Sequence, residues 1–267
     1  MITLNLFHIP VWRHAWRKLA LMASLLLVTM IAGSVEQRAT TNQENLDHEF
    51  QFVRLIFTTH PQYGSRRWQE SWTTDAPEAE QHLLGGINRL TLINTGTEGK
   101  NLSMMDDRIF NYPFIYAVDV GHWYLSDVEA QRMREHLLRG GFLMVDDFHG
   151  TQEWQIFIES MQRVFPDRTI VDVEDSDPIF HVLYDITERP DIPNINGAIS
   201  GNYVEKDGIT PYWRGIYDDD GRLMVMINFN VDLGDAWEHA DNPLYPVLFT
   251  TTAYNFCINY LTYAMTH

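Results

Sequence analysis

The run Phe142-Leu143-Met144-Val145 leads without a break into Asp146-Asp147-Phe148-His149-Gly150. Four consecutive apolar residues after the pair Gly140-Gly141 predict a β-strand. Apolar side chains then recur at helical spacing from Trp154 to Phe165, and Pro166 follows, which predicts an amphipathic helix. Strand, polar turn and helix therefore succeed one another in this part of the chain.

The same alternation extends in both directions. Upstream, Phe114-Ile115-Tyr116-Ala117-Val118 is apolar throughout, which predicts a strand in the centre of a covered sheet. Ser126-Asp127-Val128-Glu129 has the pattern of a capping box and predicts a helix between the two strands. Downstream, residues 169–173 predict another strand. The alternation indicates an α/β domain with a mostly parallel central sheet, helices on both faces and right-handed crossovers.

The remaining segments add elements around this core. We expect strands at residues 50–57 and 89–94, a helix at 78–84, a hairpin of residues 214–217 and 223–228, and a long apolar helix at 246–265. Two long loops, residues 60–77 and 190–211, connect these elements.

Composition limits the class of protein. The chain has 267 residues, and 36 Asp and Glu against 19 Lys and Arg give a formal net charge of −17. A hydrophobic content of 45% is typical of a folded protein. The acidity argues against a nucleic-acid partner, because phosphate binding needs clustered Lys and Arg. The single cysteine, Cys257, excludes an intramolecular disulfide and a Cys-rich zinc site.

The N-terminal segment, residues 1–34, has the order of a signal peptide. It contains no acidic residue, and three basic residues precede an apolar run of 15 residues that ends at Gly33. That run is shorter than the roughly 20 residues that span a bilayer, so we expect cleavage before Val35, with an uncleaved membrane anchor as the alternative. Residues 35–49 are predicted to be a polar linker, and 50–267 a single α/β domain. The sequence therefore predicts a periplasmic or secreted protein.

Two polar turns are expected to meet at one edge of the sheet. Asp119 and His122 follow one predicted strand, and Asp146, Asp147 and His149 follow the next. Parallel sheets bind ligands beyond the carboxyl ends of their strands, and consecutive strands are often neighbours. Carboxylates and imidazoles suit ligand contact, general acid–base catalysis or a divalent metal. The structural alternative is that Asp147 or His149 caps the next helix while Asp146 accepts hydrogen bonds from loop amides.

Two further groups are candidates for ligand contact. Arg67 and Trp68 lie in the first long loop with Asp75, and arginine beside indole suits a carboxylate, a phosphate or a sugar face. Burial of tryptophan that fixes the loop explains the same residues equally well. Asp232 and Asp235 follow the second strand of the hairpin. They face the same crevice, or Asp235 caps a short helical turn.

Several common catalytic motifs are absent from the sequence. It has no Gly-x-Ser-x-Gly elbow, no phosphate loop ending in Lys-Ser/Thr, no His-Glu-x-x-His and no Gly-x-Gly-x-x-Gly. The polar residues match no defined metal motif either. No cofactor and no metal are therefore assigned from sequence.

Six stretches between Phe50 and Trp237 carry a resemblance to a known family. In chain order they are the Phe50–Phe57 strand, the Trp-rich loop to Asp75-Ala76-Pro77-Glu78-Ala79, Tyr112-Pro113-Phe114-Ile115-Tyr116, Leu138 to Asp147, Asp177-Pro178-Ile179-Phe180, and Asp232 to Trp237. With these the chain resembles a bacterial family of extracytoplasmic proteins, domain of unknown function 4159. Asp177-Pro178 departs from the family, whose members tend to show His-Pro there.

The resemblance implies a flavodoxin-like sandwich similar to class I glutamine amidotransferases. Those enzymes use a cysteine nucleophile at a strand-to-helix elbow, where this chain has Asp146-Asp147. Glutamine hydrolysis by a thiol is therefore not expected. Family members often lie near genes for von Willebrand-type and membrane-anchored assembly proteins, which the resemblance suggests as partners.

Three functional hypotheses follow. The leading one is a non-catalytic binding or assembly module of the cell envelope, which recognises a small ligand or an envelope protein. The second is a hydrolase, with or without a metal, that acts on a carbohydrate or envelope substrate with Asp146 or Asp147 as general base and His149 or His122 as acid or ligand. The third is a purely structural subunit of a membrane complex, with an exposed apolar patch.

Overall fold

The computed structural model describes residues 48–64 and 70–267. The predicted signal peptide or anchor at residues 1–34, residues 35–47 of the predicted linker, and the candidates Arg67 and Trp68 lie outside the described residues. The domain that begins at His48 is described here by itself.

The domain consists of nine strands, six α-helices and several short 3-10 helices among the described residues. The strands are β1 (Val53–Ile56), β2 (Thr58–Thr59), β3 (Lys100–Ser103), β4 (Phe114–Val118), β5 (Trp123–Tyr124), β6 (Phe142–Asp146), β7 (Val171–Asp172), β8 (Tyr212–Tyr217) and β9 (Leu223–Phe229). The α-helices are α2 (Glu78–Leu90), α3 (Asp127–Leu138), α4 (Gly150–Val164), α5 (Ile195–Ser200), α6 (Leu233–Glu238) and α7 (Val247–Thr266). The 3-10 helices are η1 (Pro61–Tyr63), η3 (Ser71–Thr73), η4 (Asp107–Asn111), η5 (Val120–His122) and η6 (Pro178–Phe180).

Seven strands form one sheet in the order β3-β1-β4-β6-β9-β8-β7. The first five strands in this order are parallel, whereas β8 is antiparallel to both β9 and β7. β2 and β5 form a separate antiparallel pair. The prediction of an α/β domain with a mostly parallel sheet is confirmed.

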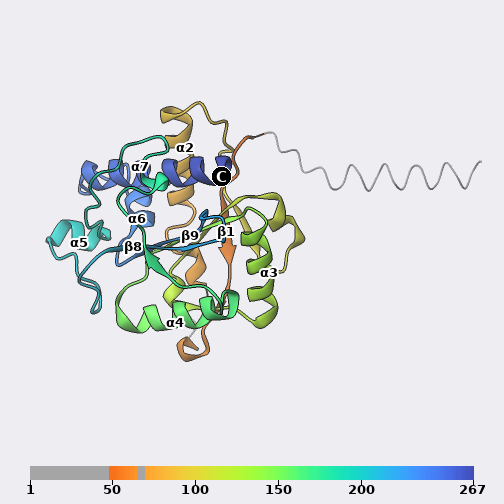
Figure 1. Cartoon of the computed structure of the whole chain (residues 1–267). Coiled ribbons are helices and arrows are strands. Elements are labelled where there is room, and N and C mark those ends of the chain that lie inside the picture. Colours follow the sequence, from red (N-terminus) through yellow and green to blue (C-terminus); the bar gives the residue numbers. More distant parts are fainter. Residues whose placement is uncertain (1–47, 65–69) are drawn as a thin grey trace, which may run out of the picture. The chain divides into compact units, whose positions relative to one another are not determined.

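Helices cover both faces of this sheet (Figure 1). Side chains alternate along a strand, and in β4 Phe114, Tyr116 and Val118 pack in the core with α2, α6 and α7, while Ile115 and Ala117 pack in the core with α3 and α4. Every residue of β4 is buried. This double coverage explains why β4 is apolar at every position.

The helix signals in the sequence correspond to helices in the structure. The capping box starts α3: the backbone N–H of Glu129 donates to the Ser126 hydroxyl, and the Glu129 carboxylate accepts from the Ser126 backbone at 2.9 Å. The terminal helix, expected at 246–265, is α7. Within the described residues, α7 included, no helix is long and apolar enough to cross a bilayer.

Three expectations about the secondary structure are wrong in detail. Residues 89–94 are not a strand, because α2 continues to Leu90, and Leu90 and Leu92 are both exposed. The strand at this edge of the sheet is instead β3, which the sequence did not predict. Only Leu102 is buried in β3, so the sequence shows no apolar alternation there. The strand expected at 169–173 is reduced to the two exposed residues of β7. The loop at 190–211 contains the short helix α5.

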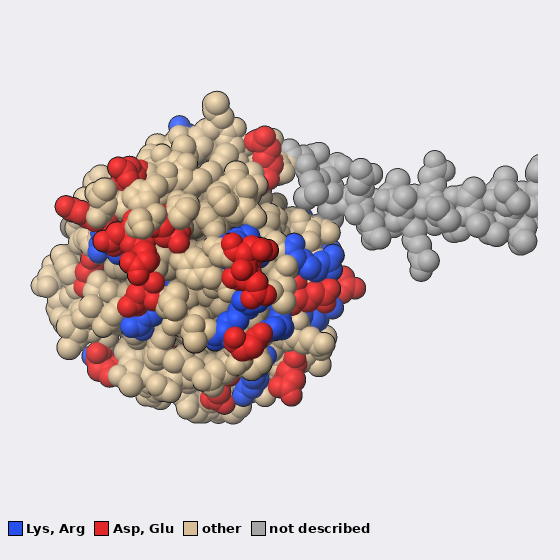
Figure 2. Space-filling view, viewed as in Figure 1, with Lys and Arg blue, Asp and Glu red and all other residues tan. Residues whose placement is uncertain are grey.

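On the face shown in Figure 2, the Lys and Arg side chains of the described residues are interspersed with Asp and Glu. Acidic side chains are visible over much of this face, as the net charge of the chain leads one to expect. A net charge far from zero, as in this chain, favours solubility.

Candidate functional site

The polar turns after β4 and β6 meet, as expected for neighbouring strands. Val118 and Asp146 are register partners, and the backbone N–H of Asp119 donates to the Asp146 carbonyl at 3.0 Å. β9 lies on the other side of β6. Residues that follow these three strands therefore come together, and we call this part of the domain the carboxyl edge.

The first residue after each of the three strands has a left-handed backbone. The φ angles are 55° at Asp119, 51° at Asp147 and 62° at Asn230. Asp and Asn adopt this conformation more readily than other residues with a Cβ. Backbone strain of this kind concentrates at functional sites, so the repeated feature marks the carboxyl edge as a candidate site.

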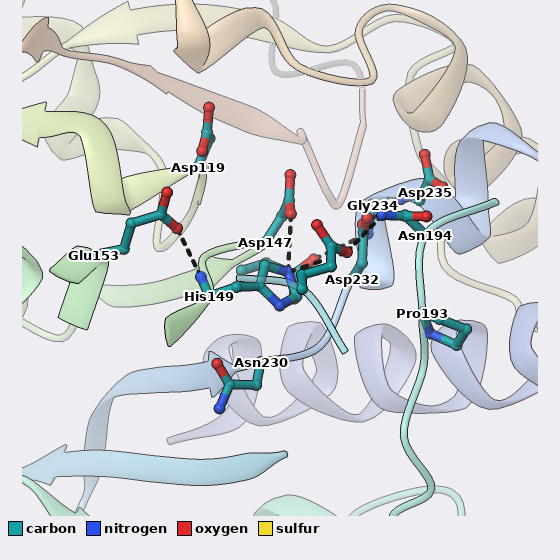
Figure 3. Close-up of polar contacts among 12 residues, drawn as sticks. Asp119, Asp147, His149, Glu153, Pro193, Asn194, Asn230, Asp232, Gly234 and Asp235 are labelled. Atoms are coloured by element: carbon teal, nitrogen blue, oxygen red, sulfur yellow. Dashed lines mark hydrogen bonds and ion pairs between the residues drawn. The ribbon is translucent and has the colours of Figure 1, made fainter. Parts of the chain in front are cut away.

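Three aspartates form what we call the carboxylate cluster: Asp75, Asp147 and Asp232. One carboxylate oxygen of each lies within 4.8 Å of the corresponding oxygens of the other two. Asp75 comes from the segment between η3 and α2. Asp147 follows β6 and Asp232 follows β9, and Figure 3 shows these two residues. Three separate segments of the chain thus deliver one carboxylate each to the same place.

Arg54 in β1 explains how a residue from a long loop reaches this position. Its guanidinium is fully buried and donates to the backbone carbonyls of Trp72 at 3.1 Å and Thr74 at 2.8 Å. It also forms an ion pair with Glu80 of α2. The loop is therefore tied to the sheet immediately before Asp75.

The carboxylate cluster is electrostatically unfavourable without a cation. At 4.8 Å and an effective dielectric constant near 20, two carboxylates repel each other by roughly 3 kcal/mol. Burial raises the pKa of Asp75 and of Asp232 well above the ordinary range, and the charge of Asp147 raises both further. The cluster therefore favours binding of a proton or another positive charge.

Asp146 lies fully buried next to the cluster. Its Oδ2 accepts the backbone N–H groups of Leu233 and Gly234, both at 2.9 Å, as the structural alternative predicts. Its Oδ1 has no hydrogen-bond partner among the described residues. Burial, followed by the charge of Asp147, raises the pKa of Asp146 well above its usual value.

A second group joins Asp119 and His122 to Glu153 of α4. The His122 ring lies between the two carboxylates, with Nδ1 2.5 Å from Asp119 and Nε2 3.3 Å from Glu153. The ammonium of Lys206 also forms an ion pair with Glu153. Burial raises the pKa of Asp119 to about 6, although the hydrogen bond to His122 opposes the shift. Within the described residues, this group contains a carboxylate that is paired with a lysine ammonium, whereas the carboxylate cluster does not.

His149 connects the two groups. Its Nε2 lies 3.2 Å from Asp147 Oδ1 and 3.7 Å from Glu205, and its backbone N–H donates to Glu153 at 2.7 Å (Figure 3). Burial lowers the pKa of His149, but the hydrogen bond and charge of Asp147 outweigh burial and leave that pKa raised. Neither Asp147 nor His149 caps α4 with its side chain, so that part of the structural alternative is wrong.

Asp235 is placed beside the carboxylate cluster but has a separate role. Its carboxylate accepts the backbone N–H of Ile195 at the start of α5, and its own backbone N–H donates to Asp232 Oδ1 at 2.8 Å. Asp232, not Asp235, therefore caps α6. Burial raises the pKa of Asp235 to about 7.

The segment 191–210 packs against the carboxyl edge and supplies residues that sequence reasoning missed. Lys206 reaches Glu153, and Asp207 accepts from the backbone N–H of Thr151 at 2.8 Å. Asn230 bridges the two sides by donating to the Thr210 carbonyl and accepting from the Gly150 backbone N–H. Only Asn230, as the residue directly after a strand, could have been selected from the sequence.

Two observations separate this site from other parts of the domain. A groove of about 790 Å³ lies elsewhere, between α4 and the β7–β8 edge, and is lined by residues such as Trp154, Phe165 and Arg214. Cys257 is fully buried in α7, and burial raises the pKa of its thiol. The groove is therefore distinct from the carboxyl edge, whose titratable side chains include carboxylates and imidazoles.

Comparison with known proteins places the chain in a family. The family model described as Domain of unknown function (DUF4159) matches residues 58–265. The chain belongs to this family. A search of curated proteins finds no match to the DUF4159 chain. The matched range contains the carboxylate cluster, Asp146 and the Asp119–His122–Glu153 group of the DUF4159 domain.

Proposed function

We propose that this chain is a non-catalytic, extracytoplasmic binding module of the cell envelope that recognises a positively charged group at its carboxyl edge. The observation that carries the proposal is the carboxylate cluster: Asp75, Asp147 and Asp232 converge within 4.8 Å. The cations nearest in the described network are already engaged, since Arg54 pairs with Glu80 and Lys206 with Glu153. A cationic ligand relieves the repulsion within the cluster.

The strand order supports this position for the site. The five parallel strands lie side by side in the order β3, β1, β4, β6, β9. Numbered by their order in the chain, this is second, first, third, fourth, fifth. We infer from that order a flavodoxin-like fold, similar to that of class I glutamine amidotransferases, in which ligands bind at the carboxyl ends of the strands. Asp147 stands at the strand-to-helix elbow, where such an amidotransferase has its cysteine.

The cellular setting is part of the proposal. The basic and apolar pattern of residues 1–34 supports export, with the membrane contacted only through that segment if it is retained. The net charge of −17 supports a protein or small-molecule partner and not a nucleic acid. An envelope protein, including one of von Willebrand type, or a small cationic ligand fits this description.

Ligand-dependent melting of the purified chain tests the proposal, because a ligand of the native state raises the melting temperature. We expect a polyamine and an amino sugar to stabilise the chain and the matched neutral sugar to have no effect. Asp147→Asn should abolish the stabilisation, whereas Asp220→Asn, in an exposed turn, should preserve it. Equal responses of the two variants contradict a site at the carboxyl edge.

A second candidate function is the Asp/His-dependent hydrolase. It is favoured by the carboxylate–imidazole pair at the elbow, in which His149 Nε2 lies 3.2 Å from Asp147 Oδ1. Such a pair suits general acid–base catalysis. Turnover of a carbohydrate or envelope substrate by the purified chain, lost in Asp147→Asn, would establish this function in place of the binding module.

A further inference from the structure

We propose that the positive charge bound by the carboxylate cluster is a single divalent metal ion of the Ca²⁺ or Mg²⁺ class, coordinated by Asp75, Asp147 and Asp232. The inference rests on the proposed function, because it names the cation that the carboxyl edge receives.

The donor set determines the class of metal. All three donors are carboxylate oxygens, which bind Ca²⁺, Mg²⁺ and Mn²⁺, whereas structural zinc sites use sulfur and nitrogen. Coordination distances of about 2.1–2.5 Å place opposite ligands of one ion up to about 5 Å apart. Three oxygens that lie within 4.8 Å of one another therefore fit around one ion, with waters in the remaining positions.

An independent observation comes from Asp146, which is not one of the three ligands. It is fully buried, and its Oδ1 has no partner among the described residues. Asp146 Oδ2 accepts from the Gly234 backbone N–H, and a Cβ built at Gly234 would collide with Asp75 Oδ2, another buried atom without a described partner. Gly234 therefore lies against both carboxylates, each of which has one buried oxygen without a partner among the described residues. Buried acceptors of this kind are usually satisfied by a bound ion or water.

Neighbouring groups orient the proposed ligands. His149 Nε2 lies 3.2 Å from Asp147 Oδ1, and the backbone N–H of Asp235 donates to Asp232 Oδ1 at 2.8 Å. Arg54 fixes the segment before Asp75 through its bonds to two backbone carbonyls. Each ligand is therefore held by a second residue, which is the arrangement found around metal sites.

The Asp119–His122–Glu153 group is the competing location for an ion. There the imidazole lies between the two carboxylates, and Lys206 pairs with Glu153. An ion at this place would have to displace an ammonium group. Among the described residues no Lys or Arg side chain pairs with Asp75, Asp147 or Asp232, which is why we assign the ion to the carboxylate cluster.

Metal binding to the full chain, stripped with a chelator, tests the assignment. Isothermal titration with Ca²⁺, Mg²⁺ and Mn²⁺ should give one ion per chain, and the ion should raise the melting temperature. Asp147→Asn should weaken binding more than about tenfold, because it removes a charged ligand while Asn retains the left-handed backbone. In chelator, the same variant should melt above the wild type, since a like charge is lost. Asp220→Asn should behave as the wild type. If Asp147→Asn fails to fold, Asp75→Asn removes another proposed ligand and takes its place in the test.

The outcomes separate the ion from the proposed function. Absence of ion binding, with stabilisation by an organic cation intact, overturns the inference and leaves the binding module in place. Ion binding that survives Asp147→Asn but is lost in Glu153→Gln also overturns it. If the ion binds to the wild type and is lost in Asp147→Asn, the inference is supported. If no organic ligand stabilises the wild type in the same experiments, the proposed ligand-binding function fails.

Discussion

Arg54 in β1 and Glu80 in α2 form an ion pair that is almost completely removed from water, with exposed fractions of 0% and 4%. The same guanidinium lies 5.2 Å from the centre of the Tyr116 ring in β4. One side chain therefore links two strands, a helix and the segment that carries Asp75. We therefore expect Arg54 to contribute both to the stability of the sheet and to the position of Asp75.

Replacement of Arg54 by methionine should lower the free energy of unfolding by about 3–5 kcal/mol, because Glu80 then stays buried without a partner. Urea denaturation followed by circular dichroism measures the change. Arg139→Met is the control, since Arg139 and Glu135 form an exposed pair that contributes at most about 1 kcal/mol. Similar losses in both variants would show that burial of the Arg54–Glu80 pair is unimportant.

Alanine at Gly234 should destabilise the domain by about 1–3 kcal/mol, because the added Cβ collides with the Asp75 carboxylate and lies 2.8 Å from Tyr116 Oη. Gly85→Ala in α2 is the matched control. Nothing lies within 4 Å of a Cβ there, so the change should be neutral or should stabilise the helix by about 0.5–1 kcal/mol. Relative to the wild type, the melting temperature should fall in Gly234→Ala and should stay the same or rise in Gly85→Ala.

His136 should make stability depend on pH. Burial, with the backbone contact to Pro113 opposing it and the charges of Arg139 and Arg222 adding to it, lowers its pKa from 6.5 to about 4. The unfolded chain binds this proton below pH 6.5, whereas the folded chain does not until about pH 4. The stability that the neutral ring contributes is therefore complete above pH 6.5 and falls by about 1.4 kcal/mol per unit as the pH decreases through this window.

Denaturation of the wild type and of His136→Gln across pH 4.5–7 isolates this effect. The difference in unfolding free energy between the two should shift in favour of the variant as the solution becomes more acidic. A difference that is constant with pH would mean that His136 has an ordinary pKa in the folded chain.

Lys206 should hold the segment 191–210 against α4. Lys206→Met removes the ammonium from Glu153, whose side chain is 2% exposed, and leaves that carboxylate with His122 and the His149 backbone N–H. Hydrogen exchange should accelerate in residues 201–210 more than in α7. The exposed variant Arg139→Met should leave both rates unchanged, and uniform acceleration in Lys206→Met would indicate global unfolding instead.

The sequence allowed prediction of those elements whose signal is local. The capping box at Ser126 and the apolar strands β4 and β6 depend on neighbouring residues only, and they are present in the structure. β3 was missed because an edge strand with one buried residue has no apolar pattern. Leu90 and Leu92 suggested a strand, but apolar residues also occur on exposed surfaces.

The candidate site was predictable in part, because some of its residues directly follow strands that the sequence predicts. Asp147 and Asp232 directly follow strands or their turns, so their position at the sheet edge can be inferred from the topology. The position of Asp75 cannot, because it is fixed by Arg54, which precedes it by a long loop. The pairing of Lys206 with Glu153 likewise joins residues far apart in the chain, and neither residue stands in a recognisable motif.

The left-handed turns after β4, β6 and β9 have a consequence for how such a domain diversifies. At Asp119, Asp147 and Asn230 the backbone tolerates glycine, asparagine or aspartate and penalises most other residues. Exchange of aspartate for asparagine replaces one carboxylate oxygen by an amide nitrogen and leaves the backbone conformation unchanged. Related domains can therefore change the charge at these three neighbouring positions by single Asp/Asn substitutions, while the backbone of the turns stays the same.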